Sequence, residues 1–394
     1  MSAGAPNGSH NDGPLIYLIA GEPSGDLLGG RLMASLKDRQ PGVRFAGVGG
    51  ARMGEQGLDS LFPMSELSTM GLAEIVPHIP HLLQRIKQTV AEVERLRPAV
   101  LITIDAPEFN FRVAKKLQGQ GIPLIHYVAP TVWAWKPWRA RKVAAFLDHL
   151  MALLPFEPPY FEAEGLDCTF VGHPVVVGGA DGGDGAAFRG RHGIGPDERL
   201  LCVLPGSRRG EVGRLLPVFS ETVDLLARRF PDLRLVVPTA ETVAEAVEEG
   251  VAGWPLPTIV TQGEAEKFDA FAAADLALAA SGTVALELAM AGTPAVIGYR
   301  LHKISAFLAR RLVKVDYANI ANIILDRPAV PEYLLEDCHA DMLAPELIRL
   351  LEDPAARTEQ TAAVGEAMRQ LGVGGPSPSE RAADVVLEVI GRGG

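Results

Sequence analysis

Short, nearly continuous apolar runs alternate with amphipathic helical stretches along this chain, and the alternation occurs in two series. The runs of the first series lie at residues 15–20, 43–48, 100–104, 124–128 and 149–153. Those of the second series lie at residues 200–204, 233–237, 258–261, 275–279 and 295–298. Strands that are apolar along nearly their whole length are typical of parallel sheets covered by helices on both faces. The pattern therefore predicts an α/β fold of two Rossmann-like lobes with a cleft between them, faced by the carboxyl ends of the strands.

A stretch without periodicity separates the two series. It reads VVVGGADGGDGAA at residues 175–187, a composition typical of a flexible linker. The length of 394 residues also exceeds one compact core and favours two domains. We predict five segments: a disordered tail at residues 1–14, a first lobe at 15–177, a linker at 178–187, a second lobe at 188–370, and a C-terminal helix at 371–394 that can pack back on the first lobe.

Composition argues against several classes of protein. The formal net charge of −11 argues against a nucleic-acid binder, which needs a basic field. The three cysteines are far apart, so they support neither a disulfide framework nor a zinc site and indicate the reducing cytosol. The polar N-terminus lacks the basic and apolar regions of a signal peptide, and no run reaches the ~20 mostly apolar residues of a transmembrane helix. We expect a cytoplasmic protein, soluble or peripheral on a membrane, that requires no metal.

Two glycine-containing turns in the second lobe have the features of an anion site. The first turn contains Gly206, Ser207 and Arg208 between a strand and a helix. Small residues let backbone N–H groups approach an anion, the helix N-terminus adds partial positive charge, and the arginine supplies forked donors suited to phosphate. The alternative is an ordinary tight turn with a solvated arginine pair.

The second turn contains Ser281, Gly282 and Thr283 at the start of another helix. Glu287 lies one helical turn deeper on the same face, where a carboxylate can accept both ribose hydroxyls of a nucleotide. The alternative makes Ser281 a plain N-cap and Glu287 a solvated surface acid. Two such turns in one lobe, with an acid behind one of them, favour a nucleoside diphosphate over a lone phosphate.

Acidic residues follow two strands of the first lobe. The turn GEPSGD carries Glu22, Ser24 and Asp26, and it suits sugar hydroxyls better than a pyrophosphate, which the acids would repel. Asp26 is equally well explained as the N-cap of the next helix. Asp105 ends the strand at residues 100–104, where partial desolvation can raise its pKa and suit it as general base for a sugar hydroxyl. The alternative for Asp105 is a helix cap in front of a proline.

Two surfaces of the first lobe indicate an amphiphilic partner. Three tryptophans, among them Trp133, are interleaved with Arg139 and other cations in WAWKPWRARK, a pattern suited to an anionic amphiphile. The alternative is a helix whose cations extend over a core edge. A second, apolar surface predicts docking to an anionic membrane, or packing against the second lobe or a partner subunit; its residues are Met70, Leu72, Val76, Ile79 and Leu83.

With these residues in view, the chain resembles the lipid-A-disaccharide synthases. The resemblance extends in order over roughly residues 15–390, so it is far more specific than any single glycine motif. The segments that carry it are AGEPSGD (20–26), GVGGARM (47–53), MGLAEIVP (70–77), IDAPEFN (104–110), IHYVAPTVWAW (125–135), LLPFEP (153–158), VGHP (171–174), LPGSRRGEV (204–212), SGTVALE (281–287) and RRLVKVDY (310–317).

The resemblance implies an inverting GT-B glycosyltransferase, and we expect it to need no cofactor. It would join UDP-2,3-diacylglucosamine to 2,3-diacylglucosamine 1-phosphate (lipid X) through a β-1,6 bond and release UDP. The family's roles carry over to Asp105 as catalytic base and Arg208 as a diphosphate contact, and Glu22, Ser24 and Asn322 match active-site positions. The family works at the cytoplasmic face of the inner membrane, on an anionic surface, and can form homodimers with exchanged C-terminal portions.

Two other interpretations use the same residues. Another UDP-N-acetylglucosamine enzyme of the GT-B fold, a transferase or a 2-epimerase, would share Glu287 and the Ser-Gly-Thr turn but would not need the tryptophan and cation cluster. A two-lobed solute-binding module would need an export signal.

Overall fold

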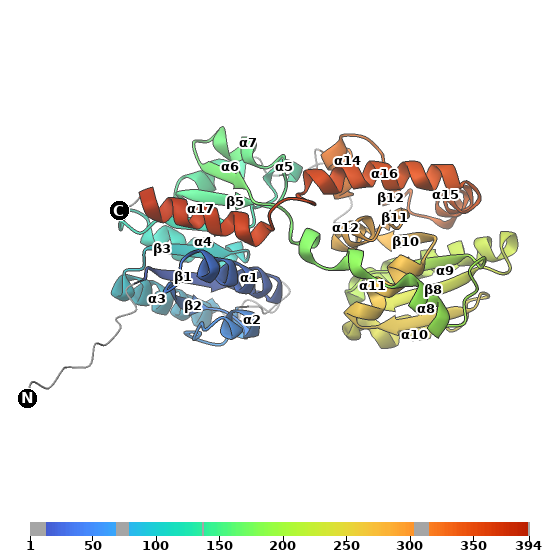
Figure 1. Ribbon diagram of the computed structural model, residues 1–394, viewed down its shortest axis with the longest axis horizontal. Coiled ribbons are helices and arrows are strands. Elements are labelled where there is room, and N and C mark those ends of the chain that lie inside the picture. Colours follow the sequence, from blue (N-terminus) through green and yellow to red (C-terminus); the bar gives the residue numbers. More distant parts are fainter. Residues whose placement is uncertain (1–12, 68–78, 136–137, 303–314, 393–394) are drawn as a thin grey trace, which may run out of the picture. The chain divides into compact units, whose positions relative to one another are not determined.

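The computed structural model describes residues 13–67, 79–135, 138–302 and 315–392. It divides the chain into two compact units, which are treated separately below (Figure 1). The first unit comprises Met1–Pro174 and Gly375–Gly394, and the second comprises Val175–Gly374. Each unit contains a six-stranded parallel sheet with helices packed against it, so the predicted α/β fold of two Rossmann-like lobes is confirmed.

The sheet of the first unit has the strand order β2-β1-β3-β4-β5-β6. Its strands are β1 (Leu15–Ala20), β2 (Arg44–Val48), β3 (Val100–Ile104), β4 (Leu124–Tyr127), β5 (His149–Ala152) and β6 (Asp167–Phe170). Its helices are α1 (Pro23–Arg39), α2 (Ala51–Glu55), η1 (Met64–Glu66), α3 (Ile79–Leu96), α4 (Pro107–Leu117), α5 (Val132–Trp135), α6 (Trp138–Ala144), α7 (Pro158–Glu162) and α17 (Pro378–Arg392). The direction of strand addition reverses between β1 and β3, so the turns after these two strands are neighbours at the edge where such folds bind ligands.

Alternate side chains of β1 enter two different cores. Tyr17 and Ile19 pack in the cluster on one face of the sheet, and Ile16 and Leu18 pack in the cluster on the other face. This burial on both faces explains why the strand is apolar at every position. The second cluster also contains Val386 and other residues of α17, which runs beside α1 (Figure 1). The C-terminal helix therefore covers the sheet of the first unit, although the second unit precedes it in sequence.

The sheet of the second unit has the strand order β12-β11-β10-β7-β8-β9. Its strands are β7 (Leu200–Leu204), β8 (Arg234–Thr239), β9 (Thr258–Gln262), β10 (Leu276–Ala280), β11 (Ala295–Tyr299) and β12 (Glu332–Leu334). Its helices are η3 (Pro174–Val177), η4 (Ala180–Gly182), α8 (Gly185–Arg191), α9 (Arg209–Arg229), η5 (Glu241–Val243), α10 (Ala244–Val251), α11 (Glu264–Ala273), α12 (Thr283–Met290), α14 (Ile320–Leu325), α15 (Ala340–Glu352) and α16 (Pro354–Gln370). Here the reversal lies between β7 and β10, which places the two predicted anion-binding turns side by side.

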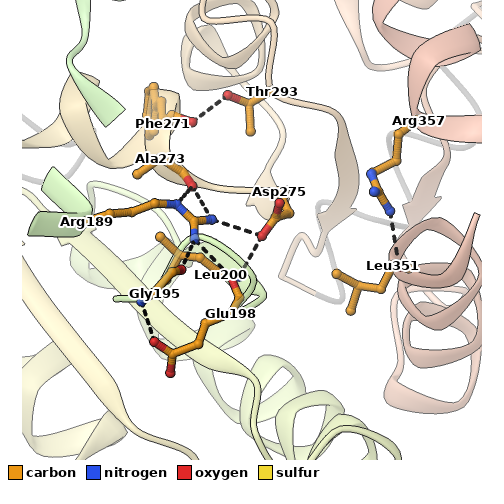
Figure 2. A network of polar contacts seen from close by, with 10 residues as sticks. All are labelled: Arg189, Gly195, Glu198, Leu200, Phe271, Ala273, Asp275, Thr293, Leu351 and Arg357. Carbon is orange, nitrogen blue, oxygen red and sulfur yellow. Dashed lines mark hydrogen bonds and ion pairs between the residues drawn. The ribbon is translucent and has the colours of Figure 1, made fainter. Parts of the chain in front are cut away.

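Much of the stretch predicted as a linker is helical in the structure. Asp184 caps α8 by accepting a hydrogen bond of 2.8 Å from the backbone of Ala187. The guanidinium of Arg189 donates to the backbone carbonyls of Ala273 (3.0 and 2.8 Å), Gly195 (3.0 Å) and Glu198 (2.9 Å), as Figure 2 shows. These bonds fasten α8 and the loop after it to the end of α11.

Candidate active site

A pocket of about 780 Å³ lies in the second unit, at the carboxyl ends of its central strands. The residues predicted from the two turns line it together: Gly206, Ser207 and Arg208 after β7, and Ser281, Gly282, Thr283 and Glu287 after β10. Because β7 and β10 are hydrogen-bonded neighbours, two segments far apart in sequence converge on one pocket. The pocket therefore depends both on the glycine-containing turns and on the strand order that places β7 beside β10.

Glycine is required in the first turn for two reasons. Gly206 has φ +119°, and a Cβ placed on it would lie 2.7 Å from the Cβ of Glu211. The N-cap residues of α9 and α12 are Arg208 and Gly282, and within the described part of the chain neither caps its helix with a side-chain hydrogen bond. The pocket therefore faces two helix N-termini with uncapped first turns, which favours an anionic ligand. Since Gly282 is the N-cap of α12, the alternative that made Ser281 the cap is wrong.

The side chain of Arg208 is held only loosely. It is 84% exposed, and its Nη1 lies 3.7 Å from Oε1 of Glu211. An exposed pair at this distance contributes little to stability, so the guanidinium is available to a ligand in the pocket.

Glu287 is held by a cation that sequence reasoning missed. Nζ of Lys267 donates to both carboxylate oxygens of Glu287, at 2.9 and 3.1 Å, and both side chains are mostly buried. Glu287 is therefore not a solvated surface acid, and the ion pair fixes its carboxylate toward the pocket. Lys267 belongs to α11, which follows the glycine turn after β9. The helix of Lys267 begins just after β9, a third strand of the sheet that contains β7 and β10. This position is the sequence feature that could have indicated a residue of the pocket.

Asn322 does not lie with the other predicted nucleotide residues. It is fully buried in α14, and among the residues that the structure describes it is not part of the pocket lining. Its Nδ2 donates to the carbonyl of Val330 (2.7 Å) and to Glu332 (3.2 Å), while its Oδ1 accepts from the backbone of Val330 (2.8 Å). The amide is used within the fold, which corrects its placement at the nucleotide.

In the first unit, the GEPSGD turn divides into exposed and buried residues. Glu22 and Ser24 are exposed at the start of α1. Asp26 is buried, and its carboxylate accepts backbone hydrogen bonds from Gly50 (2.7 Å), Arg52 (2.9 Å) and Met53 (3.1 Å). Asp26 therefore holds the N-terminus of α2 rather than capping its own helix or meeting a sugar. This corrects its assignment to the acceptor site.

Asp105 follows β3 in an unusual backbone conformation. Asp105 and Ala106 have φ +49° and +43°, both in the left-handed region that residues with a Cβ rarely adopt. The N-cap of α4 is Ala106, so the alternative that made Asp105 the cap is wrong. The half-buried carboxylate stands at the turn beside the one after β1, because Ala20 and Ile104 are register partners. This placement suits a base that meets a substrate hydroxyl.

Trp133 is tied to a buried carboxylate. Its Nε1 donates to Oε1 of Glu157 at 3.2 Å, and Oε2 of Glu157 accepts from the backbones of Leu153 (3.2 Å) and Leu154 (3.0 Å). Burial raises the pKa of Glu157 to about 7, although these hydrogen bonds oppose the shift. Sequence reasoning did not single out Glu157, since one acid in LLPFEP gives no sign of its burial.

The remaining part of the tryptophan and cation cluster lies on α6. Trp138 is 54% exposed, and Nζ of Lys142 lies 4.4 Å from its ring centroid. Arg139 is half-buried on the same helix. Lys136 and its following proline lie outside the described residues.

The predicted apolar surface is described only in part. Ile79 and Leu83, at the start of α3, are 40% and 44% exposed. Met70, Leu72 and Val76 lie outside the described residues. Among the helices that the structure describes, none is long and apolar enough to cross a membrane. The described ranges also contain no group of three or more His, Cys, Asp or Glu residues arranged to hold a metal ion.

The sequence matches one protein family along most of its length. The model of the Lipid-A-disaccharide synthetase family matches residues 16–382. A lipid-A-disaccharide synthase of Rhodospirillum centenum is 62% identical over 379 residues, which are 95% of this chain and 94% of the relative. That of Paramagnetospirillum magneticum is 56% identical over 384 residues, 96% of this chain and 98% of the relative.

Solved structures of low sequence identity share the fold. A putative UDP-N-acetylglucosamine 2-epimerase from Listeria monocytogenes superposes with a TM-score of 0.60 at 14% identity, covering 96% of each chain. A UDP-GlcNAc 2-epimerase from Neisseria meningitidis bound to UDP-GlcNAc gives a TM-score of 0.59 at 12% identity, covering 96% of this chain and 99% of its own. At these identities the likeness establishes the fold alone.

Proposed function

Because the chain belongs to the Lipid-A-disaccharide synthetase family, we propose that its second unit binds a UDP-sugar and that its first unit activates the attacking sugar hydroxyl. The protein is a glycosyltransferase of lipid A biosynthesis. We assign UDP-2,3-diacylglucosamine as donor and 2,3-diacylglucosamine 1-phosphate as acceptor. The products are then lipid A disaccharide 1-phosphate, joined by a β-1,6 bond, and UDP.

The pocket of the second unit supports the donor assignment. Two uncapped helix N-termini and the exposed guanidinium of Arg208 offer a diphosphate several donors. Glu287, oriented by Lys267, lies deeper along α12, where the two carboxylate oxygens can accept ribose hydroxyls. The convergence of both turns on one pocket is the observation that carries the proposal. The bound UDP-GlcNAc in the Neisseria meningitidis enzyme is consistent with it.

The chemistry assigned to the first unit is removal of a proton. Asp105 accepts the proton of the acceptor 6-hydroxyl as O6 attacks the anomeric carbon of the donor. The bond from that carbon to the diphosphate oxygen breaks on the opposite face, and UDP leaves with the electron pair, so configuration inverts. Negative charge that develops on the diphosphate is stabilised by Arg208 and by the N–H groups that begin α9 and α12. Glu22 and Ser24, exposed at the turn after β1, bind acceptor hydroxyls.

The acceptor is assigned to an anionic membrane surface on the cytoplasmic face of the inner membrane. The exposed Ile79 and Leu83 belong to the docking surface, and Trp133 and Arg139 lie on the segment that meets the lipid headgroup. A homodimer with exchanged C-terminal portions would form through α17. In this chain α17 already packs on its own first unit, with Arg39 bonded to Asp384 at 2.5 Å, and a partner's helix can replace it by the same contacts.

Replacing Asp105 by asparagine tests the division of labour between the two units. The amide keeps the shape of the side chain but cannot take a proton, so turnover should fall roughly 10²–10⁴-fold. The affinity for UDP, measured by isothermal titration, should not change, because the pocket belongs to the other unit. Near-normal turnover by Asp105→Asn would remove Asp105 from the mechanism.

A further inference from the structure

We propose that Gly21 and Asn110 are positioning residues that hold the Asp105 turn in its left-handed conformation, and so place the carboxylate for proton transfer. The inference rests on the proposed role of Asp105 as base. It adds Gly21, the first residue of GEPSGD, and Asn110, the last residue of IDAPEFN. The nucleotide and acceptor assignments give neither residue a role.

The conformation of this turn needs support from its surroundings. Asp105 and Ala106 are consecutive, and both have positive φ, at +49° and +43°. The left-handed region is unfavourable for a residue with a Cβ, and two such residues in succession persist only where neighbouring contacts impose them. The backbone N–H of Asp105 donates to the carbonyl of Tyr127 at 2.9 Å, which fixes only the start of the turn.

Asn110 fixes the rest of the turn from α4. Its Nδ2 donates to the carbonyl of Ile104 at 3.1 Å and to that of Asp105 at 2.7 Å, and its backbone N–H donates to the carbonyl of Ala106 at 3.1 Å. The side chain is fully buried, and its Oδ1 has no hydrogen-bond partner within the described ranges. Rotating the amide would bring Oδ1 against two carbonyl oxygens, so the observed orientation is the one that holds the turn.

An unpartnered buried acceptor is unfavourable, because it has lost its water without gaining a donor. The fold nevertheless keeps this acceptor at Asn110 and gains two hydrogen bonds on the peptides that flank Asp105. Both side-chain hydrogen bonds of Asn110 go to the carbonyls on either side of Asp105, whereas the amide of Asn322 bonds the segment at Val330 through both of its ends. We therefore connect Asn110 with the geometry of the turn rather than with the strength of the fold.

Gly21, which directly follows β1, leaves space for the turn that contains Asp105 and Ala106. A Cβ on Gly21 would lie 2.6 Å from the Cβ of Ala106, closer than real Cβ atoms approach. The φ of Gly21 does not lie in the left-handed region, so a glycine is required here by the contact with Ala106 and not by the backbone of Gly21 itself. A side chain at Gly21 would push Ala106 and the adjoining Asp105 away from the turn that carries Glu22.

A compensating pair of substitutions tests the role of Gly21. Gly21→Ala should lower kcat at least ten-fold while leaving the dissociation constant for UDP unchanged. Adding Ala106→Gly removes the opposing Cβ and gives the left-handed position to a residue that adopts it freely, so the double variant should recover most of the lost turnover. Ala106→Gly alone is the matched control, expected to stay near the wild-type kcat.

Asn110→Ala is the second arm and should lower kcat at an unchanged UDP dissociation constant. Melting temperatures and circular dichroism of every variant report whether it folds, and the Gly21 pair carries the test if Asn110→Ala does not fold. Wild-type kcat in a folded Gly21→Ala, or equal impairment of the single and double variants, overturns the inference. Asp105→Asn measured in parallel separates the two proposals. Near-normal turnover of Asp105→Asn removes the base and this inference together, whereas its inactivity beside fully active Gly21→Ala and Asn110→Ala refutes the inference alone.

Discussion

Replacing Arg208 by alanine is expected to weaken UDP binding and to leave the fold intact. The side chain is 84% exposed, and its Nη1 lies 3.7 Å from Oε1 of Glu211 in an ion pair. Exposed pairs of this kind contribute about 0–1 kcal/mol, so the free energy of unfolding should change by no more than that. The guanidinium nevertheless lines the pocket between the two helix N-termini, where its removal takes a charged donor from the diphosphate.

The magnitude follows from the class of bond. Hydrogen bonds to charged groups contribute about 1.5–3 kcal/mol, which corresponds to a loss of roughly one to two decades in affinity. Arg209 supplies a matched control. It is the next residue, it is also an exposed arginine, and it is absent from the pocket lining among the described residues. Arg209→Ala lowers the net charge by the same amount and should change the UDP dissociation constant by less than about two-fold, because exposed charges away from a ligand are screened.

Isothermal titration of UDP into the wild type and both variants, at one fixed ionic strength, measures the difference. Urea unfolding of the same three proteins confirms that they are equally folded. Unchanged UDP affinity in Arg208→Ala would refute the assignment of this side chain to the diphosphate. Equal losses in Arg208→Ala and Arg209→Ala would mean that only general charge attraction acts, and would refute the pocket geometry as its cause.

The remaining predictions concern metal, pH and the membrane. Activity should survive EDTA, because Arg208 and two helix N-termini can meet the diphosphate charge; loss of activity that magnesium or manganese restores would contradict this. The folded state raises the pKa of Glu157 to about 7, so it binds a proton that the unfolded chain has released. Stability should therefore fall between about pH 4.5 and pH 7 in the wild type and fall less in Glu157→Gln, as urea unfolding at several pH values would show; equal slopes would refute the burial effect. Replacing Ile79 and Leu83 with serine should weaken sedimentation with anionic liposomes at unchanged gel-filtration size, whereas a smaller species would identify a subunit interface instead.

The central strands of both sheets were predictable from local pattern. Each is buried on both faces, so its sequence is almost entirely apolar, apart from buried polar residues such as Thr103 and His126, and it can be recognised without knowledge of the fold. The two strands that sequence reasoning missed, β6 and β12, lie at the ends of their sheets. They read DCTF and EYL, and they are short and partly exposed, so no continuous apolar run distinguishes them from loops.

Side-chain roles that depend on contacts between residues far apart in sequence were harder to predict from the sequence. The glycine turns indicated the pocket because the residues that begin a helix are adjacent in sequence. The partner of Glu287 is Lys267, which lies 20 residues earlier on another helix, so no local pattern indicates it. Asp26 follows a strand in the manner of a ligand-binding acid, yet it accepts hydrogen bonds from residues 24–27 positions away. The Gly-rich stretch before Arg189 has the composition of a linker, whereas the network in Figure 2 anchors it.

Glycosyl transfer is measured by incubating the purified protein with UDP-2,3-diacylglucosamine and 2,3-diacylglucosamine 1-phosphate and analysing the products by mass spectrometry. We expect a diacylglucosamine disaccharide bearing one phosphate, formed with one UDP for each disaccharide and only when both substrates are present. UDP release without a disaccharide, or a sugar nucleotide altered in the absence of acceptor, would contradict the assignment of this chain as a lipid-linked sugar transferase.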